Sequence, residues 1–169
     1  MKIPHVTLVL VTLALGLVSS ALSGAEQPGW INAADNKIHA QKLVNEQMAK
    51  FKNIDIKFLG LHAVAPGEKE QKMIACTHDR INKPDSEDDY WVSQKHWTLV
   101  FQKLAEPEVI EVMIPLQDAS GNVIGTACFI FKGFKTGDSE YPYYMRAVAM
   151  RNEMARATPS LAALFQPIQ

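Results

Sequence analysis

The chain has 169 residues, of which 47% are hydrophobic and 21% are charged, and it carries 17 Lys and Arg against 18 Asp and Glu. This composition is typical of one globular domain and excludes a disordered chain, a collagen-like repeat and a disulfide-dense miniprotein. A formal net charge of −1 gives no electrostatic footprint for nucleic acid, so we expect no nucleic-acid partner.

The N-terminal segment has the pattern of a secretory signal peptide. Lys2 precedes an apolar run over residues 6–18, and small residues follow it. Ser23 and Ala25 suit positions −3 and −1 of a signal-peptidase site, so the mature chain is expected to begin at Glu26. The alternative is an uncleaved membrane anchor, since the whole apolar stretch is near the minimum length of a span.

This cleavage would divide the chain into a signal peptide over residues 1–25 and a single domain over residues 26–169. Removing 25 of the 169 residues leaves 144, which is long enough for one hydrophobic core without metal or disulfide staples. No later stretch approaches membrane-spanning length. We therefore expect a periplasmic or secreted protein with no membrane span after signal cleavage.

The first element of the mature chain is an amphipathic helix over residues 33–52. Asn32 can cap its first turn. Apolar residues then recur at helical spacing and form one stripe: Ala40, Leu43, Val44, Met48 and Phe51.

Five strand-like runs follow, over residues 56–65, 71–78, 97–104, 109–116 and 123–132. Short turn signals between them predict antiparallel pairing.

The last of these runs is apolar on both faces, which predicts a central strand covered above and below. Gly125 near its start indicates a bend or a close backbone approach. A helix over residues 141–157 and a short turn through Phe165 close the chain. The order predicts an α+β domain with a single five-stranded antiparallel sheet, a long N-terminal helix and a C-terminal helix.

Three stretches carry a family resemblance: residues 61–81, residues 83–89 and above all residues 114–125, which read Ile-Pro-Leu-Gln-Asp-Ala-Ser-Gly-Asn-Val-Ile-Gly. They resemble bacterial extracytoplasmic sensory domains of the Cache type, the exported relatives of PAS domains. The resemblance implies a small-ligand pocket between the sheet and the segment that links the second and third strands, here residues 79–96. The arginine-x-tryptophan-tyrosine set of amino-acid-binding members is absent, so the ligand class stays open.

The linking segment holds the candidate ligand-binding residues, which are Arg80, Tyr90, Trp91, Lys95, His96 and Trp97. Four of them are rings within eight residues, and aromatic walls with polar tips are typical of small-molecule pockets. The two cations could pair with an anionic ligand. The alternative is that the rings cover one face of the sheet.

The same segment contains an acidic run from Asp85 to Asp89. It is typical either of a calcium loop or, as favoured here, of a solvated loop in which Asp88 or Asp89 caps a helical turn.

Cys76 and Cys128 are the only cysteines, and an exported protein matures in an oxidising compartment that allows a disulfide. The strand order that the resemblance implies places their strands on either side of the first strand, about 9–10 Å apart, so we expect them unbridged. His62, His78 and His96, with Cys76, leave open a haem or metal site.

Motifs of catalysis are absent from the sequence: it has no glycine-flanked serine, no phosphate-binding glycine loop and no recognisable Cys-His dyad. We expect an exported, free-standing module that senses or binds a small molecule, has no catalytic activity and acts through an envelope protein partner. The alternative is a periplasmic haem or metal-binding protein. The identity of any cofactor is left open.

Overall fold

The structure is a computed structural model that describes residues 29–103, 105–106 and 108–168. The segment predicted to be a signal peptide lies outside these residues. In chain order the elements are η1 (Ala33–Asp35), α1 (His39–Lys50), β1 (Ile56–Val64), β2 (Gln71–Cys76), α2 (Glu87–Lys95), β3 (Leu99–Gln102), β4 (Val109–Gln117), β5 (Val123–Lys132), α3 (Tyr141–Arg156) and η2 (Leu161–Phe165).

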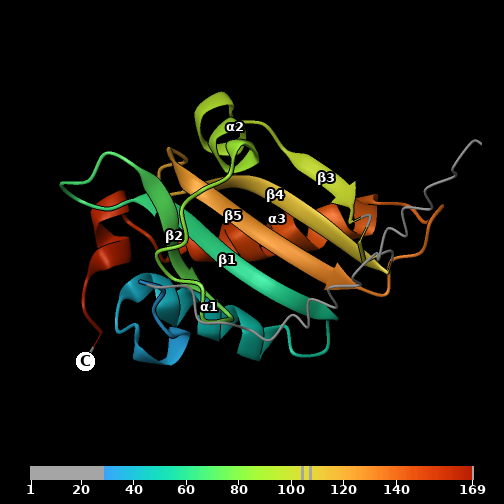
Figure 1. Cartoon of the computed structure of the whole chain (residues 1–169), viewed down its shortest axis with the longest axis horizontal. Helices are drawn as coiled ribbons and strands as arrows, with labels where there is room; N and C mark the ends of the chain where they lie inside the picture. The colour runs from blue at the N-terminus through green and yellow to red at the C-terminus, as the bar shows by residue number, and fades with distance from the viewer. Residues whose placement is uncertain (1–28, 104, 107, 169) are drawn as a thin grey trace, which may run out of the picture.

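The five strands form one sheet in the order β2-β1-β5-β4-β3, and every neighbouring pair is antiparallel (Figure 1). The predicted α+β architecture is therefore confirmed. Strand β5 lies between β1 and β4, so the prediction that the doubly apolar run is a central strand is also confirmed.

The first face of the sheet carries the larger hydrophobic core, beneath helices α1 and α3 (Figure 1). Strand residues alternate between the two faces, and Leu59 and Leu61 of β1 and Phe129 of β5 point into this core with no exposed surface. The fully buried methionines Met150 and Met154 of α3 pack against them. This core accounts for most of the buried apolar surface and holds the sheet in place.

The second face is covered by α2 and by the segment that precedes it, and it has a smaller cluster of buried residues. These are Phe58, Met73, Cys76, Ile81, Val92, Met113 and Cys128. Because this cluster covers only part of the face, room remains beside it for polar groups and cavities.

The long N-terminal helix predicted over residues 33–52 is not confirmed. Asn32 caps only the short η1 turn, and α1 begins at His39. Between them the chain is extended, because the Asn36 amide donates to the carbonyl of Ile74 and Ile38 pairs with Pro167. These contacts tie the segment to β2 and to the C-terminus, and they override its helical pattern.

Helix α2 lies in the stretch that was expected to be mostly loop. Ser86 and Asp89 form a reciprocal capping box at its start, so the expected capping role of Asp89 is confirmed. The helix ends at His96, which adopts the left-handed conformation with φ 57°. Strand β3 consequently starts at Leu99 rather than at Trp97.

In the part of the chain that the structure describes, no helix is long and apolar enough to cross a membrane.

Candidate functional site

A buried polar cluster lies between the sheet and the N-terminal end of α2. Its centre is His62, which projects from β1 toward α2 among apolar neighbours and is 2% exposed. The imidazole Nδ1 lies 2.6 Å from Oδ1 of Asp85 and 3.6 Å from Oδ1 of Asp89. Two carboxylates with almost no exposed side-chain surface therefore face one imidazole.

Further hydrogen bonds fix both carboxylates. Gln71 of β2 donates to Asp85 Oδ2 at 2.5 Å. Asp89 Oδ2 accepts from the backbone amide of Ser86 at 2.9 Å and from its hydroxyl at 2.7 Å. Thr126 of β5 donates to the backbone carbonyl of Asp89 at 2.8 Å and so joins the helix to the sheet. The cluster is a built network with fixed positions, because strands β1, β2 and β5 and helix α2 each contribute a side chain.

The expectation of a solvated acidic loop is wrong for two of its residues. Asp85 and Asp89 point into the protein, where Asp85 meets the buried imidazole of His62 and Asp89 accepts hydrogen bonds from Ser86. Asp88, which lies between them, is partly buried and lines a cavity near the cluster.

Cys128 is part of the same cluster. Its thiol donates to Oδ1 of Asp89 at 3.6 Å. Burial, followed by the charge of Asp89, raises the pKa of this thiol well above its ordinary value. Cys128 is therefore a protonated thiol here and not a thiolate nucleophile.

The two cysteines are free, which agrees with the expectation that they are unbridged. Gly60 of β1 pairs with Cys76 on one side and with Cys128 on the other. The two cysteines are therefore two strands apart, about 9–10 Å, which is beyond the reach of a disulfide.

Two adjoining cavities extend from the polar cluster across the second face of the sheet. The inner cavity, of about 90 Å³, is lined by His62, Asp89 and Cys128. The outer cavity, of about 200 Å³, is lined by Lys57 and His78, among others. Both are lined by Phe58, Arg80, Lys103 and Ile130, and together we call them the groove.

Some of the basic side chains that line the groove form ion pairs with glutamates, and others do not. Lys103 pairs with Glu111 at 2.7 Å, and Lys57 pairs with Glu106. Arg80 and Lys83 form no ion pair within the described part of the chain. Arg80, an exposed residue, thus lines both cavities together with Phe58 and Ile130 and has no ion-pair partner among the described residues.

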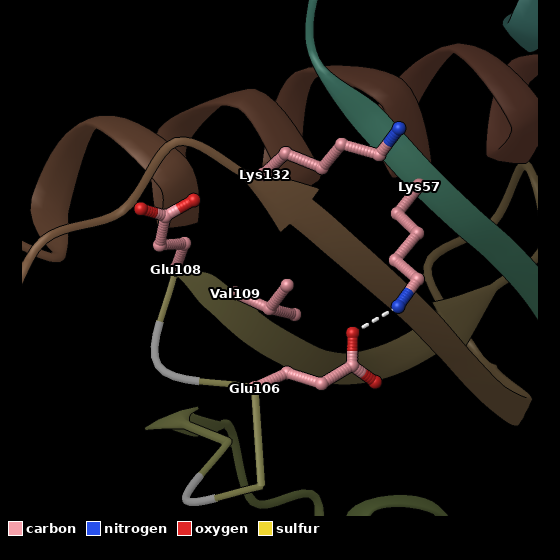
Figure 2. Close-up of a pocket in the computed structure, with 5 residues that line it drawn as sticks. All are labelled: Lys57, Glu106, Glu108, Val109 and Lys132. Atoms are coloured by element: carbon pink, nitrogen blue, oxygen red, sulfur yellow. Dashed lines mark hydrogen bonds and ion pairs between the residues drawn. The ribbon is translucent and has the colours of Figure 1, made fainter.

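A larger depression of about 440 Å³ lies at the end of the sheet beyond the groove. Figure 2 shows that Lys57 turns toward Glu106 across it, while Glu108 and Lys132 lie on its other side around Val109. Its lining holds two lysines, two glutamates and Val109, and Lys57 is already paired with Glu106. The groove differs in holding the cation of Arg80, which has no ion-pair partner among the described residues, and we take the groove as the candidate site.

The structure places the sequence-derived candidates in two separate regions. Arg80 lines the groove. Trp91 and Trp97 contact each other with ring centroids 5.8 Å apart, and they are 39% and 51% exposed. Tyr90, Trp91 and Lys95 are exposed residues of α2, His96 and Trp97 are exposed just after its end, and none of the five lines either cavity of the groove.

The residues named for a haem or metal site are also separated. His78 and His96 are exposed, and the Cys76 thiol donates to the backbone carbonyl of His78 at 2.7 Å. Burial raises the pKa of the Cys76 thiol. Only His62 of that set lies among other metal-ligating groups.

No family model matches the sequence, and no curated protein matches it significantly. Among solved structures, the chain is similar to the GAF domain of A. aeolicus nlh2 in an inactive state, with 12% identity, a TM-score of 0.49 and coverage of 73% of this chain and 86% of that chain. It is also similar to Pseudomonas aeruginosa HmgR, with 10% identity, a TM-score of 0.49 and coverage of 75% and 69%.

A Burkholderia vietnamiensis protein described as a GAF sensor is 17% identical, with a TM-score of 0.46 and coverage of 69% of this chain and 76% of that chain. The Cache assignment predicted from residues 61–81, 83–89 and 114–125 is wrong: three of the matched structures are described as GAF domains or as a GAF sensor. The Asp118 and Gly121 signature that suggested it serves instead to close the turn between β4 and β5, where Gly121 has φ 86°.

Proposed function

We propose that this protein is a small-molecule binding or sensing module whose ligand carries an anionic group, such as a carboxylate, on a small apolar body. The observation that carries the proposal is Arg80, a cation without an ion-pair partner in the described residues, which lines both adjoining cavities together with Phe58 and Ile130. A guanidinium binds a carboxylate through two parallel hydrogen bonds, and Phe58 and Ile130 offer the apolar contact for the rest of the ligand.

The size of the groove limits the ligand. Cavities of 200 and 90 Å³ reach only the lower end of the range for small-molecule sites, roughly 300 Å³. A ligand the size of benzoate or of a short carboxylic acid suits this volume. Nucleotides and larger cofactors are too large for it.

The module is proposed to act without catalysis and to pass its signal to a protein partner. The only described thiol in the groove is protonated and hydrogen-bonded to a carboxylate, so it is not set up as a nucleophile. Trp91 of α2 and Trp97, which follows the helix, form an exposed pair that offers a partner an aromatic contact, and ligand binding at the groove beside α2 is proposed to shift it.

Export to the periplasm or the medium is part of the proposal, and its support is the apolar run over residues 6–18 with the small residues that follow. The intact mass of protein from the cell envelope fraction of its native host tests this. A mature chain that starts at Glu26 supports export, and a full-length chain in the cytosol contradicts it.

The ligand proposal is tested by thermal melts with benzoate, butyrate and succinate, each compared with the corresponding neutral amide. We expect at least one carboxylate to raise the melting temperature while its amide does not. Replacement of Arg80 by Gln should lower the affinity by about 10- to 100-fold, which corresponds to the loss of a hydrogen bond to a charged group.

The matched control is Arg156→Gln, because Arg156 is exposed on α3 and lies on the opposite face of the sheet. This variant should bind the carboxylate as the wild type does. Equal binding by the Arg80→Gln variant, or no stabilisation by any carboxylate, would overturn the proposal.

A further inference from the structure

We propose that His62, Asp89 and Cys128 form a binding site for a single divalent transition-metal ion of the zinc class, at the inner end of the groove. The three residues come from β1, α2 and β5, and one ligand atom of each lies within 4.8 Å of the other two. Imidazole, carboxylate and thiolate are the three protein ligands that zinc prefers.

Two of the three distances between the ligand atoms match those around a tetrahedral ion, and the third pair, His62 and Cys128, lies within 4.8 Å. Zinc bonds of about 2.0–2.3 Å to nitrogen, oxygen and sulfur place neighbouring ligand atoms roughly 3.3–3.7 Å apart. Oδ1 of Asp89 lies 3.6 Å from Nδ1 of His62 and 3.6 Å from Sγ of Cys128. An ion can therefore enter among these atoms with only small movements of the side chains.

The surroundings hold the ligands in place. All three side chains are buried, and two of them project from neighbouring central strands of the sheet. The hydrogen bonds from Ser86 to Oδ2 of Asp89 leave Oδ1 directed toward His62 and Cys128. Such hydrogen bonds to the second oxygen orient a ligating carboxylate.

The carboxyl groups also lack another cationic partner. Asp85 and Asp89 both face the imidazole of His62, and no Lys or Arg pairs with either of them among the described residues. The buried oxygens are therefore not already taken by a cationic side chain that would compete with a metal ion.

Binding requires two changes in protonation. The Cys128 thiol gives up its proton to solvent, since the thiolate is the ligand. Nδ1 of His62 can bind the ion only without a proton, so the neutral imidazole would carry its proton on Nε2, and the contact of Nδ1 with Oδ1 of Asp85 at 2.6 Å would give way to the ion. The inner cavity, which all three ligands line, gives the ion an entry path.

This site does not depend on the proposed carboxylate ligand, because Arg80 is not among the metal ligands. If Arg80→Gln did not change carboxylate binding, the carboxylate proposal would be contradicted and the metal proposal would not. If the protein did not bind metal, the metal proposal would be contradicted and the carboxylate proposal would not.

The test is a titration of the purified, reduced, metal-free protein with Co²⁺, which reports a thiolate ligand by a charge-transfer band in the near ultraviolet. We expect one Co²⁺ per chain, a band of this kind, and displacement of Co²⁺ by Zn²⁺. Replacement of Cys128 by Ser should remove the band, and Asp89→Asn and His62→Ala should lower the Zn²⁺ affinity by more than about 100-fold, since loss of a ligand exceeds the effect of an outer partner.

Cys76→Ser is the matched control, because Cys76 is also buried and lies on the same face, on the other side of Gly60. His78→Ala is the control for His62. Both controls should bind Co²⁺ as the wild type does. Thermal melts of each metal-free variant show whether it folds. The proposal would be overturned if the folded wild type gave no charge-transfer band, or if the band survived in Cys128→Ser.

Discussion

Gly125 of β5 approaches the backbone carbonyl of His62 in β1 so closely that a Cβ at position 125 would overlap with the carbonyl oxygen. The backbones of β1 and β5 cannot move apart easily here, because Thr126, the residue after Gly125, pairs with His62 in the sheet. The sequence-based expectation of a close backbone approach at Gly125 is therefore confirmed, and the contact lies directly behind the polar cluster.

We predict that Gly125→Ala destabilises the protein by about 1–3 kcal/mol or more, because the added methyl group meets backbone atoms. The matched control is Gly60→Ala, whose Cβ would meet the end of the Phe58 ring at 2.7 Å, a side chain that can turn away. Urea denaturation of both variants gives the comparison. A loss for Gly125→Ala no larger than that for Gly60→Ala would contradict the structural assignment.

Both thiols should react slowly with an alkylating reagent in the native protein. Burial raises the pKa of each, and for Cys128 the charge of Asp89 adds to the effect of burial. In denaturant without reductant, intact mass should show two additions per chain, since the cysteines are free. Thiols that react only after reduction would show a disulfide and would contradict the strand order.

The turn between β4 and β5 predicts a pH dependence of stability. The Asn122 side chain, together with backbone amides of the turn, donates to the Asp118 carboxylate and lowers its pKa from the ordinary value. A lowered folded-state pKa stabilises the fold above the unfolded pKa of about 3.9, and this contribution is lost as the pH falls through the folded value.

Asp118→Ala should therefore lower the melting temperature at pH 7, and the difference from the wild type should shrink as the pH falls below about 4. Asp35→Ala serves as the control, because Asp35 is exposed in η1. A difference between Asp118→Ala and the wild type that stays constant from neutral to acidic pH would show that the carboxylate charge contributes nothing to the turn.

Trp91→Ala should leave carboxylate binding unchanged and cost about 1 kcal/mol of stability, the range for one aromatic contact, because Trp91 is 39% exposed and touches Trp97 rather than the groove. Val92→Ala, on the same helix but with no exposed surface, should cost more, in the range of buried aliphatic truncations. Melts with and without the carboxylate measure both effects. Loss of binding in Trp91→Ala would place this ring in the site.

The sheet could be predicted from the sequence because its signals are local. Turn residues separate the strands, and the double apolar pattern of β5 indicates a central strand. Helix α2 was not predicted, since its nine residues are mostly polar and its stability depends on the Ser86 cap and on contacts with β4 and β5. The start of α1 was misplaced for the same reason, because Asn36 is held by a residue on β2.

The site was harder to predict, because its members are distant in sequence. His62, Asp85, Asp89 and Cys128 meet only when β1 pairs with β5 and α2 folds over both. One signal was present: His62 shares a face with Phe58 and Gly60 in a strand whose other residues, apart from Lys57, are apolar, and a buried histidine needs a polar partner. The pattern could not show that the partners were two carboxylates from the acidic run.

The central pairing of β1 with β5 also has a consequence for how the chain folds. Leu61 pairs with Ala127, so two neighbouring inner strands of the sheet are far apart in the sequence. Until β5 has been synthesised, β1 can pair only with β2, and a lone two-stranded hairpin is marginally stable in water. Contacts of such long sequence separation slow folding, so the chain through the end of β5 at Lys132 must leave the ribosome before the five-stranded sheet forms.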